Sequence, residues 1–291
     1  MNKPLNSLFS LFGSKFRQRK NLLPILARYK RTMYVEPFGG AGGLLLGKEP
    51  ERVEVYNDIN KLFVNLFHVV KDNDKVKQLQ YLLDLSPMSR ELWSESYQLI
   101  CEYYGGGGVK SKEKFGLKDY SDEVVLAYAV FYLQNFSFSG KFMCSFAGVE
   151  KGRSAGNKCS RYKTKRERLM DYHDRLKTVC IENLDALDCI RRYDDEKTLF
   201  YIDPPYACNT KDPYKTGEFH EQALVALLKT IKGNFVLSCY DTDCYKSLEA
   251  ICDKYEFDAY KSADKPANKR SRACEVVYAS KIDYYTNVIL G

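Results

Sequence analysis

The chain contains Thr198-Leu199-Phe200-Tyr201-Ile202-Asp203-Pro204-Pro205-Tyr206, an apolar run that ends in an acid, two prolines and a tyrosine. The run has the composition of a strand, and the prolines stop both a strand ladder and a helix. We expect Asp203 and Tyr206 at the carboxyl end of a buried strand, where open α/β sheets place their ligands. An acid, an unpartnered backbone carbonyl and an aromatic face suit a planar amine such as N6 of adenine. Taken alone, the motif is equally typical of an ordinary turn with a buried tyrosine.

A second motif lies upstream, where a predicted strand leads into Glu36-Pro37-Phe38-Gly39-Gly40-Ala41-Gly42-Gly43. Glycines let the backbone approach a ligand closely and adopt positive φ angles. The motif lacks the G-x-G-x-x-G spacing of dinucleotide sites and the Gly-Lys-Ser/Thr of a P-loop. No basic side chain lies in it, which suits a ligand without a triphosphate. A tight turn is the alternative, but four glycines in five residues favour a binding site.

Two further acids follow predicted strands. Asp58 comes about 20 residues after the glycine-rich loop, the spacing at which an acid can accept hydrogen bonds from ribose hydroxyls. Asp185 follows a short strand and could accept from the amino group of an adenine ring. Each acid could instead be the N-cap of the helix after it, near Asn60 and at residues 186–192. For Asp58 the ribose role is favoured and the two roles can coexist, whereas for Asp185 spacing does not separate them.

Strand and helix patterns alternate at both ends of the chain, which predicts an α/β fold with a parallel, helix-covered sheet. The strands expected are residues 32–36, 52–56, 179–181, 199–202, 235–238, 274–279 and 282–285. The helices expected are residues 18–29, 60–71, 75–104, 121–136, 185–192, 218–231 and 243–255. We therefore expect a catalytic domain of residues 1–75 and 171–291, interrupted by a mostly helical domain at residues 76–170.

Charge points to a polyanionic partner. The net charge of the 291 residues is +7, and the basic residues cluster at positions 15–20, 141–175 and 261–272. Residues 141–175 hold ten Lys or Arg against four acids. A solvated surface explains any one cluster, whereas three clusters beside candidate site segments favour a nucleic-acid track.

Other classes fit the sequence poorly. We expect no membrane span, because no apolar run reaches 18 residues, and no signal peptide, because the start Met1-Asn2-Lys3-Pro4 lacks an apolar core. The ten cysteines are scattered without a Cys-x-x-Cys pair, and there are three histidines, so we expect reduced thiols and no metal site. These features predict a cytoplasmic protein.

Taken together, the motifs resemble the Dam-like α group of DNA adenine-N6 methyltransferases. The order Gly13-Ser14-Lys15, the glycine-rich loop, Asp58, an insertion and Asp203-Pro204-Pro205-Tyr206 matches that family over most of the catalytic domain and little of residues 76–170. The resemblance implies a Rossmann-like methyltransferase sheet with helices on both faces and an inserted target recognition domain. It also implies a prokaryotic or phage-type protein.

The same resemblance implies the cofactor S-adenosylmethionine, with S-adenosylhomocysteine as product. Where many members carry an aromatic residue before the lysine, this chain has Leu11, with Phe12 adjacent. The cofactor contacts implied are Leu11, Phe12, Gly13, Lys15, Glu36, Pro37, Phe38, Gly39, Gly40, Ala41, Gly42, Asp58, Ile59, Asp185, Ala186 and Asp203.

The resemblance implies double-stranded DNA as substrate and Asp203, Pro204, Pro205 and Tyr206 as catalytic residues. Asp203 and the Pro204 carbonyl would accept the two N6 hydrogens of an extruded adenine, on which Tyr206 would stack. The DNA contacts expected are Arg17, Asn135, Ser139, Lys141, Lys151, Arg153, Lys158, Arg161, Lys163, Lys269 and Arg270. A cognate restriction endonuclease is a further partner that fits this setting, and we expect a monomer or weak dimer.

Three alternatives stay open from sequence. The same corner could methylate N4 of cytosine in DNA or N6 of adenine in RNA, since the amine geometry is similar. A non-catalytic DNA-binding relative is a second alternative, although Glu36, Asp58, Asp185, Asp203 and Tyr206 are all present. A generic Rossmann-type nucleotide-binding enzyme is the third, and the missing G-x-G-x-x-G disfavours it.

Overall fold

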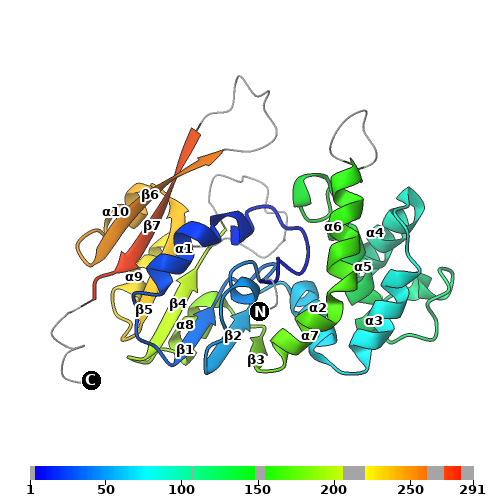
Figure 1. Cartoon of the computed structure of the whole chain (residues 1–291), viewed down its shortest axis with the longest axis horizontal. Coiled ribbons are helices and arrows are strands. Elements are labelled where there is room, and N and C mark those ends of the chain that lie inside the picture. The colour runs from blue at the N-terminus through cyan, green and yellow to red at the C-terminus, as the bar shows by residue number, and fades with distance from the viewer. Residues whose placement is uncertain (1–3, 107, 148–154, 206–219, 261–271, 283–291) are drawn as a thin grey trace.

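The structure, a computed structural model, describes residues 4–106, 108–147, 155–205, 220–260 and 272–282. Within them, one seven-stranded sheet has the order β3-β2-β1-β4-β5-β7-β6 (Figure 1). Five strands are parallel: β1 (Met33–Glu36), β2 (Val53–Asn57), β3 (Val179–Glu182), β4 (Thr198–Ile202) and β5 (Asn234–Tyr240). β7 (Arg272–Ser280) runs antiparallel to both β5 and β6 (Cys252–Tyr260). The strand order changes direction between β1 and β4, the place where open sheets bind ligands.

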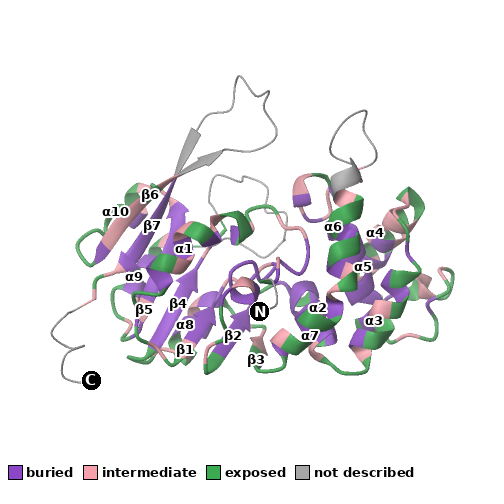
Figure 2. Cartoon of the chain, in the orientation of Figure 1, coloured by how far each residue is buried: buried purple, intermediate pink, exposed green. Residues whose placement is uncertain are grey.

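Helices cover both faces of the sheet, as the sequence predicts. Alternate residues of β4 serve the two faces: Leu199 and Tyr201 join one apolar cluster, Phe200 and Ile202 the other. The first cluster includes α1 (Arg19–Leu26), α2 (Lys61–Lys71) and α7 (Leu169–Leu176). The second includes α8 (Ala186–Arg192), α9 (Glu221–Leu228) and α10 (Asp243–Lys246). The central strands β1, β2, β4 and β5 are therefore mostly buried (Figure 2).

The insertion is a helical bundle beside the sheet (Figure 1). It comprises α3 (Lys75–Asp84), α4 (Arg90–Tyr104), α5 (Asp122–Phe136) and α6 (Ala155–Glu167). α5 is the central helix, because every residue from Val124 to Phe136 is buried. Ser121 caps it by accepting a hydrogen bond from the Val124 N–H. α2 packs on α5, so one continuous apolar core runs from the sheet into the bundle.

Short 3₁₀ turns complete the described elements: η1 (Lys15–Gln18), η2 (Leu45–Gly47), η3 (Lys110–Lys112) and η4 (Phe138–Gly140). None of the helices in the described residues has the length and apolar character needed to cross a bilayer.

Three predicted elements need correction. Residues 243–255 are not one helix, because α10 ends at Lys246 and β6 begins at Cys252, where nine residue pairs join it to β7. Sheet pairing here outweighs local helical periodicity. Residues 75–104 form two helices, since Pro87 disfavours helical backbone at Ser86. The strand expected at residues 282–285 is absent at Ile282, and residues 283–285 lie outside the described ranges.

A buried polar junction joins the N-terminal segment to α5 and α6. The Asn135 side-chain oxygen accepts hydrogen bonds from Lys165 Nζ at 3.1 Å and Ser10 Oγ at 3.3 Å. Asn135 also donates to the Phe131 carbonyl at 2.8 Å. Burial, with a smaller contribution from Arg161, lowers the pKa of Lys165 to about 7. Charging Lys165 in the folded protein therefore costs stability.

Replacing Lys165 by Met should stabilise the protein more below pH 7 than near pH 10. The folded-state pKa of about 7 lies below the unfolded value of 10.5, so the unfolded chain binds more protons between these values. Wild-type stability should rise with pH across this interval, whereas the variant lacks that contribution. Thermal unfolding at both pH values measures the difference, with the exposed Lys163→Met as control. An equal change in Tm at both pH values would contradict the assignment.

Candidate active site

Acids gather at one edge of the sheet. Because β1 to β4 are parallel, their carboxyl ends share an edge, and Glu36, Asp58, Asp185 and Asp203 stand at or just beyond these ends. The sequence motifs that are far apart in the chain are therefore brought to the same edge.

Asp203 shares a cation with a second acid. Lys15 Nζ lies 3.0 Å from Asp203 Oδ1 and 2.6 Å from Glu275 Oε1. Lys15 is 5% exposed, and Gln18 donates a hydrogen bond to the other carboxylate oxygen of Glu275. Burial lowers the pKa of Lys15, but the two carboxylates outweigh it and leave the pKa raised. Lys15 is thus charged at neutral pH.

The alternation of side chains along β4 and β7 explains why Asp203 and Glu275 both contact Lys15. Tyr201 belongs to the apolar cluster on the α1 face, and Asp203, two residues on, follows on the same side. On β7, Val277 and Ala279 belong to that cluster, and Glu275, two residues before Val277, lies on the same face of the sheet. The segment that leads through η1 into α1 carries Lys15 over both acids. Pro204 is buried and Pro205 exposed, while Tyr206 lies outside the described residues.

Glu275 is a site residue that the motif search missed. Its signal was an acid inside the apolar strand sequence Cys274-Glu275-Val276-Val277-Tyr278, directly after a basic stretch. A buried acid in a strand requires a partner, but the sequence does not tell that the partner is Lys15, 260 residues earlier.

The glycine-rich loop is shaped by β2. Tyr56 donates a hydrogen bond from its hydroxyl to the Gly40 carbonyl at 2.7 Å, and the Gly39 N–H donates to Asn57 at 2.7 Å. A Cβ on Gly39 would overlap the Tyr56 ring, and Gly40 and Gly42 have φ angles of +50° and +66°. The Leu8 N–H donates to the Ala41 carbonyl at 3.0 Å, so the N-terminal segment lies along the loop.

Glu36 faces the interior beneath this loop. It accepts a hydrogen bond from the Tyr34 hydroxyl at 2.7 Å, and burial raises its pKa to about 7. Arg19, whose Nε donates to the Gly43 carbonyl at 2.6 Å, interacts electrostatically with Glu36. This placement favours support of the loop, rather than direct ligand contact, as the task of the Glu36 carboxylate.

Asp58 ties the loop to α2. Its two oxygens accept from the Gly40 N–H at 2.7 Å and the Asn60 N–H at 2.8 Å. Burial raises the pKa of Asp58 to about 6 against these two hydrogen bonds. The N-cap of α2 is Asn60, which accepts from the Leu62 N–H, so the capping alternative for Asp58 is wrong.

Asp185 does cap a helix: its Oδ1 accepts from the Leu187 N–H at 2.8 Å at the start of α8. Asn183 joins this strand end to β2, donating to the Asp58 carbonyl at 2.7 Å. Ile59, next to Asp58, is 45% exposed. An exposed apolar side chain next to an acid suits a ribose and a planar base, and a carboxylate can accept further hydrogen bonds. Contact with a cofactor stays a prediction.

The family model of the D12 class N6 adenine-specific DNA methyltransferases matches residues 12–268. The chain belongs to this family. A search of curated proteins gives no match. Lys15, the glycine-rich loop and Asp203 lie inside the matched range, whereas Glu275 lies beyond it.

Membership of the D12 class makes DNA the substrate to consider, and the loop after α5 is the first candidate surface. Residues 137 and 146 form a β-bridge, and Ser139 has a strained φ of +54°. The Phe12 N–H donates to the Gly140 carbonyl at 2.9 Å, and Lys141 Nζ lies 5.6 Å from the centre of the exposed Phe12 ring. Leu11, by contrast, lies within van der Waals reach of Gly40.

The expected DNA contacts of this D12-class chain differ in accessibility. Arg17, Arg161 and Lys163 are exposed. Lys158 is half-buried on the inner side of α6 and donates to the Ser137 carbonyl at 2.5 Å, and burial lowers its pKa to about 8. Asn135 is buried, which favours a structural role. The remaining expected contacts Lys151, Arg153, Lys269 and Arg270 lie outside the described residues.

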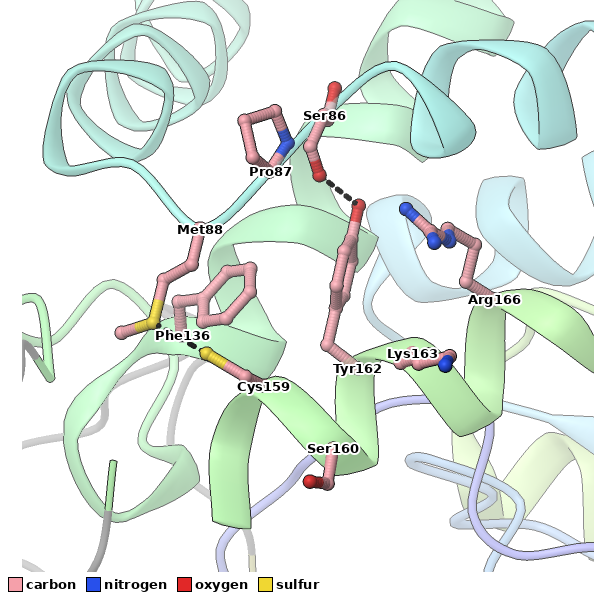
Figure 3. A pocket seen from close by; sticks show the side chains of 9 residues that line it. All are labelled: Ser86, Pro87, Met88, Phe136, Cys159, Ser160, Tyr162, Lys163 and Arg166. Carbon is pink, nitrogen blue, oxygen red and sulfur yellow. Dashed lines mark hydrogen bonds between the residues drawn. The ribbon is translucent and has the colours of Figure 1, made fainter. Parts of the chain in front are cut away.

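A hollow of about 280 Å³ lies on the inserted bundle (Figure 3). Tyr162 of α6 forms its wall and donates to the Ser86 carbonyl at 3.2 Å, while Cys159 lies 3.1 Å from the Met88 sulfur. None of the acids at the sheet edge lines it. We therefore place the candidate active site at the strand ends.

Gly39→Ala should destabilise the protein by about 1–3 kcal/mol, because the added Cβ overlaps the fully buried Tyr56 ring. Urea unfolding measures the loss. Gly105→Ala is the matched control, since its Cβ would make only ordinary contacts at 3.4 Å or more at the end of α4. Equal stability of both variants would show that the loop can move away from β2.

Replacing Arg161 and Lys163 together by Ala should weaken DNA binding and flatten its salt dependence. Each phosphate contact contributes roughly 0.9 to the slope of log affinity against log salt. Fluorescence anisotropy over a salt series measures the slope. The control is Lys229→Ala, which replaces an exposed lysine directly after α9. An unchanged slope would remove α6 from the phosphate track.

Proposed function

We propose that the chain transfers the methyl group of S-adenosylmethionine to N6 of an adenine extruded from double-stranded DNA. The observation that carries this proposal is Asp203, held by Lys15 at the carboxyl end of β4 beside the glycine-rich loop. Family membership supports the class of reaction.

The sheet edge has groups that fit the cofactor. The glycine-rich loop would face its methionine part, Asp58 the ribose hydroxyls, and Ile59 with Asp185 the adenine ring. S-adenosylmethionine supplies a methyl group that is already activated by a sulfonium. The protein therefore needs neither a covalent nucleophile nor a metal, and its task is to position the amine.

Asp203 and the Pro204 carbonyl would accept the two N6 hydrogens and point the nitrogen lone pair at the methyl carbon. A carboxylate has about four acceptor positions, so Asp203 can accept from both Lys15 and an amine. Tyr206 would stack on the extruded base, which returns roughly 1–3 kcal/mol toward the cost of unstacking.

Cytosine N4 presents a similar amine and is the second candidate. The same two acceptors could hold it, but the family favours adenine. Mass spectrometry of nucleosides from treated DNA distinguishes the products.

Asp203→Ala should reduce methyl transfer at least about 100-fold, the scale of losing one electrostatic group of a catalytic site. Lys15 keeps Glu275 as partner, so we expect the variant to fold and to bind S-adenosylmethionine in calorimetry. Asp241→Ala is the matched control, an acid directly after β5 that pairs with Lys254. Full activity of Asp203→Ala would refute the mechanism, and a wild-type protein that methylates only cytosine would refute the choice of base.

A further inference from the structure

Lys15 is held by two acids, and the second has no assigned task. Glu275 is closer to Lys15 Nζ than Asp203 is, at 2.6 Å against 3.0 Å. Glu275 comes from β7, which is separated from β4 by β5. Gln18, the last residue of η1, donates a hydrogen bond to the other carboxylate oxygen of Glu275. The contacts thus form a chain from Gln18 through Glu275 and Lys15 to Asp203.

These contacts are largely buried, so the charges of Lys15, Glu275 and Asp203 interact strongly. Lys15 and Glu275 are both nearly inaccessible, whereas the Asp203 side chain is 19% exposed. A buried ammonium needs a carboxylate, and with Asp203 alone it would cancel the charge of that group. With Glu275 opposite Lys15, Asp203 is fixed at one oxygen and keeps part of its negative charge.

That remaining charge matters for the proposed reaction. The N6 nitrogen forms a bond to the methyl carbon as the S–CH₃ bond breaks, so positive charge moves from sulfur to N6 and then leaves as a proton to water. An acceptor that is neutralised by a neighbouring cation would stabilise this charge less well.

We propose, on the basis of the function inferred above, that Glu275 is a positioning residue of the methyl transfer, acting through Lys15 to hold Asp203 in place as a charged acceptor. Glu275 lies beyond the part of the chain that the family model matches. Its assignment rests on the side of β7 it occupies and on its contacts with Lys15 and Gln18.

Glu275→Gln removes the charge and keeps the shape. We expect kcat to fall about 10- to 100-fold, with little change in affinity for S-adenosylmethionine. Losses of this size are typical when a residue that orients a metal ligand is replaced, and Glu275 likewise acts on Asp203 indirectly. Glu256→Gln is the matched control, an exposed acid on β6 opposite Val276, and should keep wild-type kcat.

Titration of Lys15 gives a readout that does not depend on turnover. In protein labelled with ¹⁵N-lysine, the Lys15 ammonium should titrate above its ordinary range in wild type, because two carboxylates oppose its burial. In Glu275→Gln we expect this midpoint to fall by roughly one pH unit or more, since one carboxylate is lost. The alkaline limb of the kcat profile should move in the same direction.

The outcomes separate the two proposals. Wild-type kcat or an unshifted Lys15 midpoint in Glu275→Gln overturns the role of Glu275. A wild-type protein without methyl transfer whose Lys15 midpoint shifts in the variant overturns the proposed function and supports the contact chain. If Glu275→Gln does not fold, Gln18→Leu replaces it, with a smaller loss of kcat and a smaller shift expected, and no change in either overturns the proposal.

Discussion

The pairing of buried charges on the α1 face of the sheet is the constraint on which the rest of the site depends. A carboxylate buried at a strand end needs a cation or hydrogen-bond donors, because an unpaired buried charge is strongly destabilising. Lys15 meets this need for Asp203 and Glu275, while Arg19, which donates to the Gly43 carbonyl, interacts electrostatically with Glu36. The N-terminal segment is therefore part of the site, although it precedes every strand.

A second buried charge cluster, with one acid between two cations, lies where the chain returns from the insertion. Glu54 on β2 is buried between Lys48 at 2.6 Å and Arg175 of α7 at 2.6 Å. Arg175 also donates to the Leu45 carbonyl just after the glycine-rich loop. The segment that follows the loop is thus held by charged residues from before and after the insertion.

The sequence predicted those parts of the site whose signal is local. Composition and turn residues are enough to place Asp203 after β4 and the glycines after β1, and the helix expected at residues 121–136 is α5. The sequence did not predict the features that depend on contacts between residues far apart in the chain. Residues 252–255 of β6 were predicted as helix because the identity of this strand comes from pairing with β7, and Glu275 was missed because its partner lies 260 residues away. The basic residues at positions 141–175 were predicted to belong to a nucleic-acid track, but Lys158 is half-buried and Lys165 is buried against Asn135.

The contact of Lys15 with both acids is made entirely by side chains of the protein, so Asp203 is positioned by the fold itself. Asp203 does not need a ligand to fix its side chain, because one oxygen already has a partner and Glu275 limits how much of its charge that partner cancels. A group that is ordered before the substrate arrives loses little conformational freedom on binding, so more of the binding energy remains for extracting a base from its stack. An exposed loop could not provide this. Burial of the cation makes the arrangement rigid, and the two carboxylates make the burial tolerable.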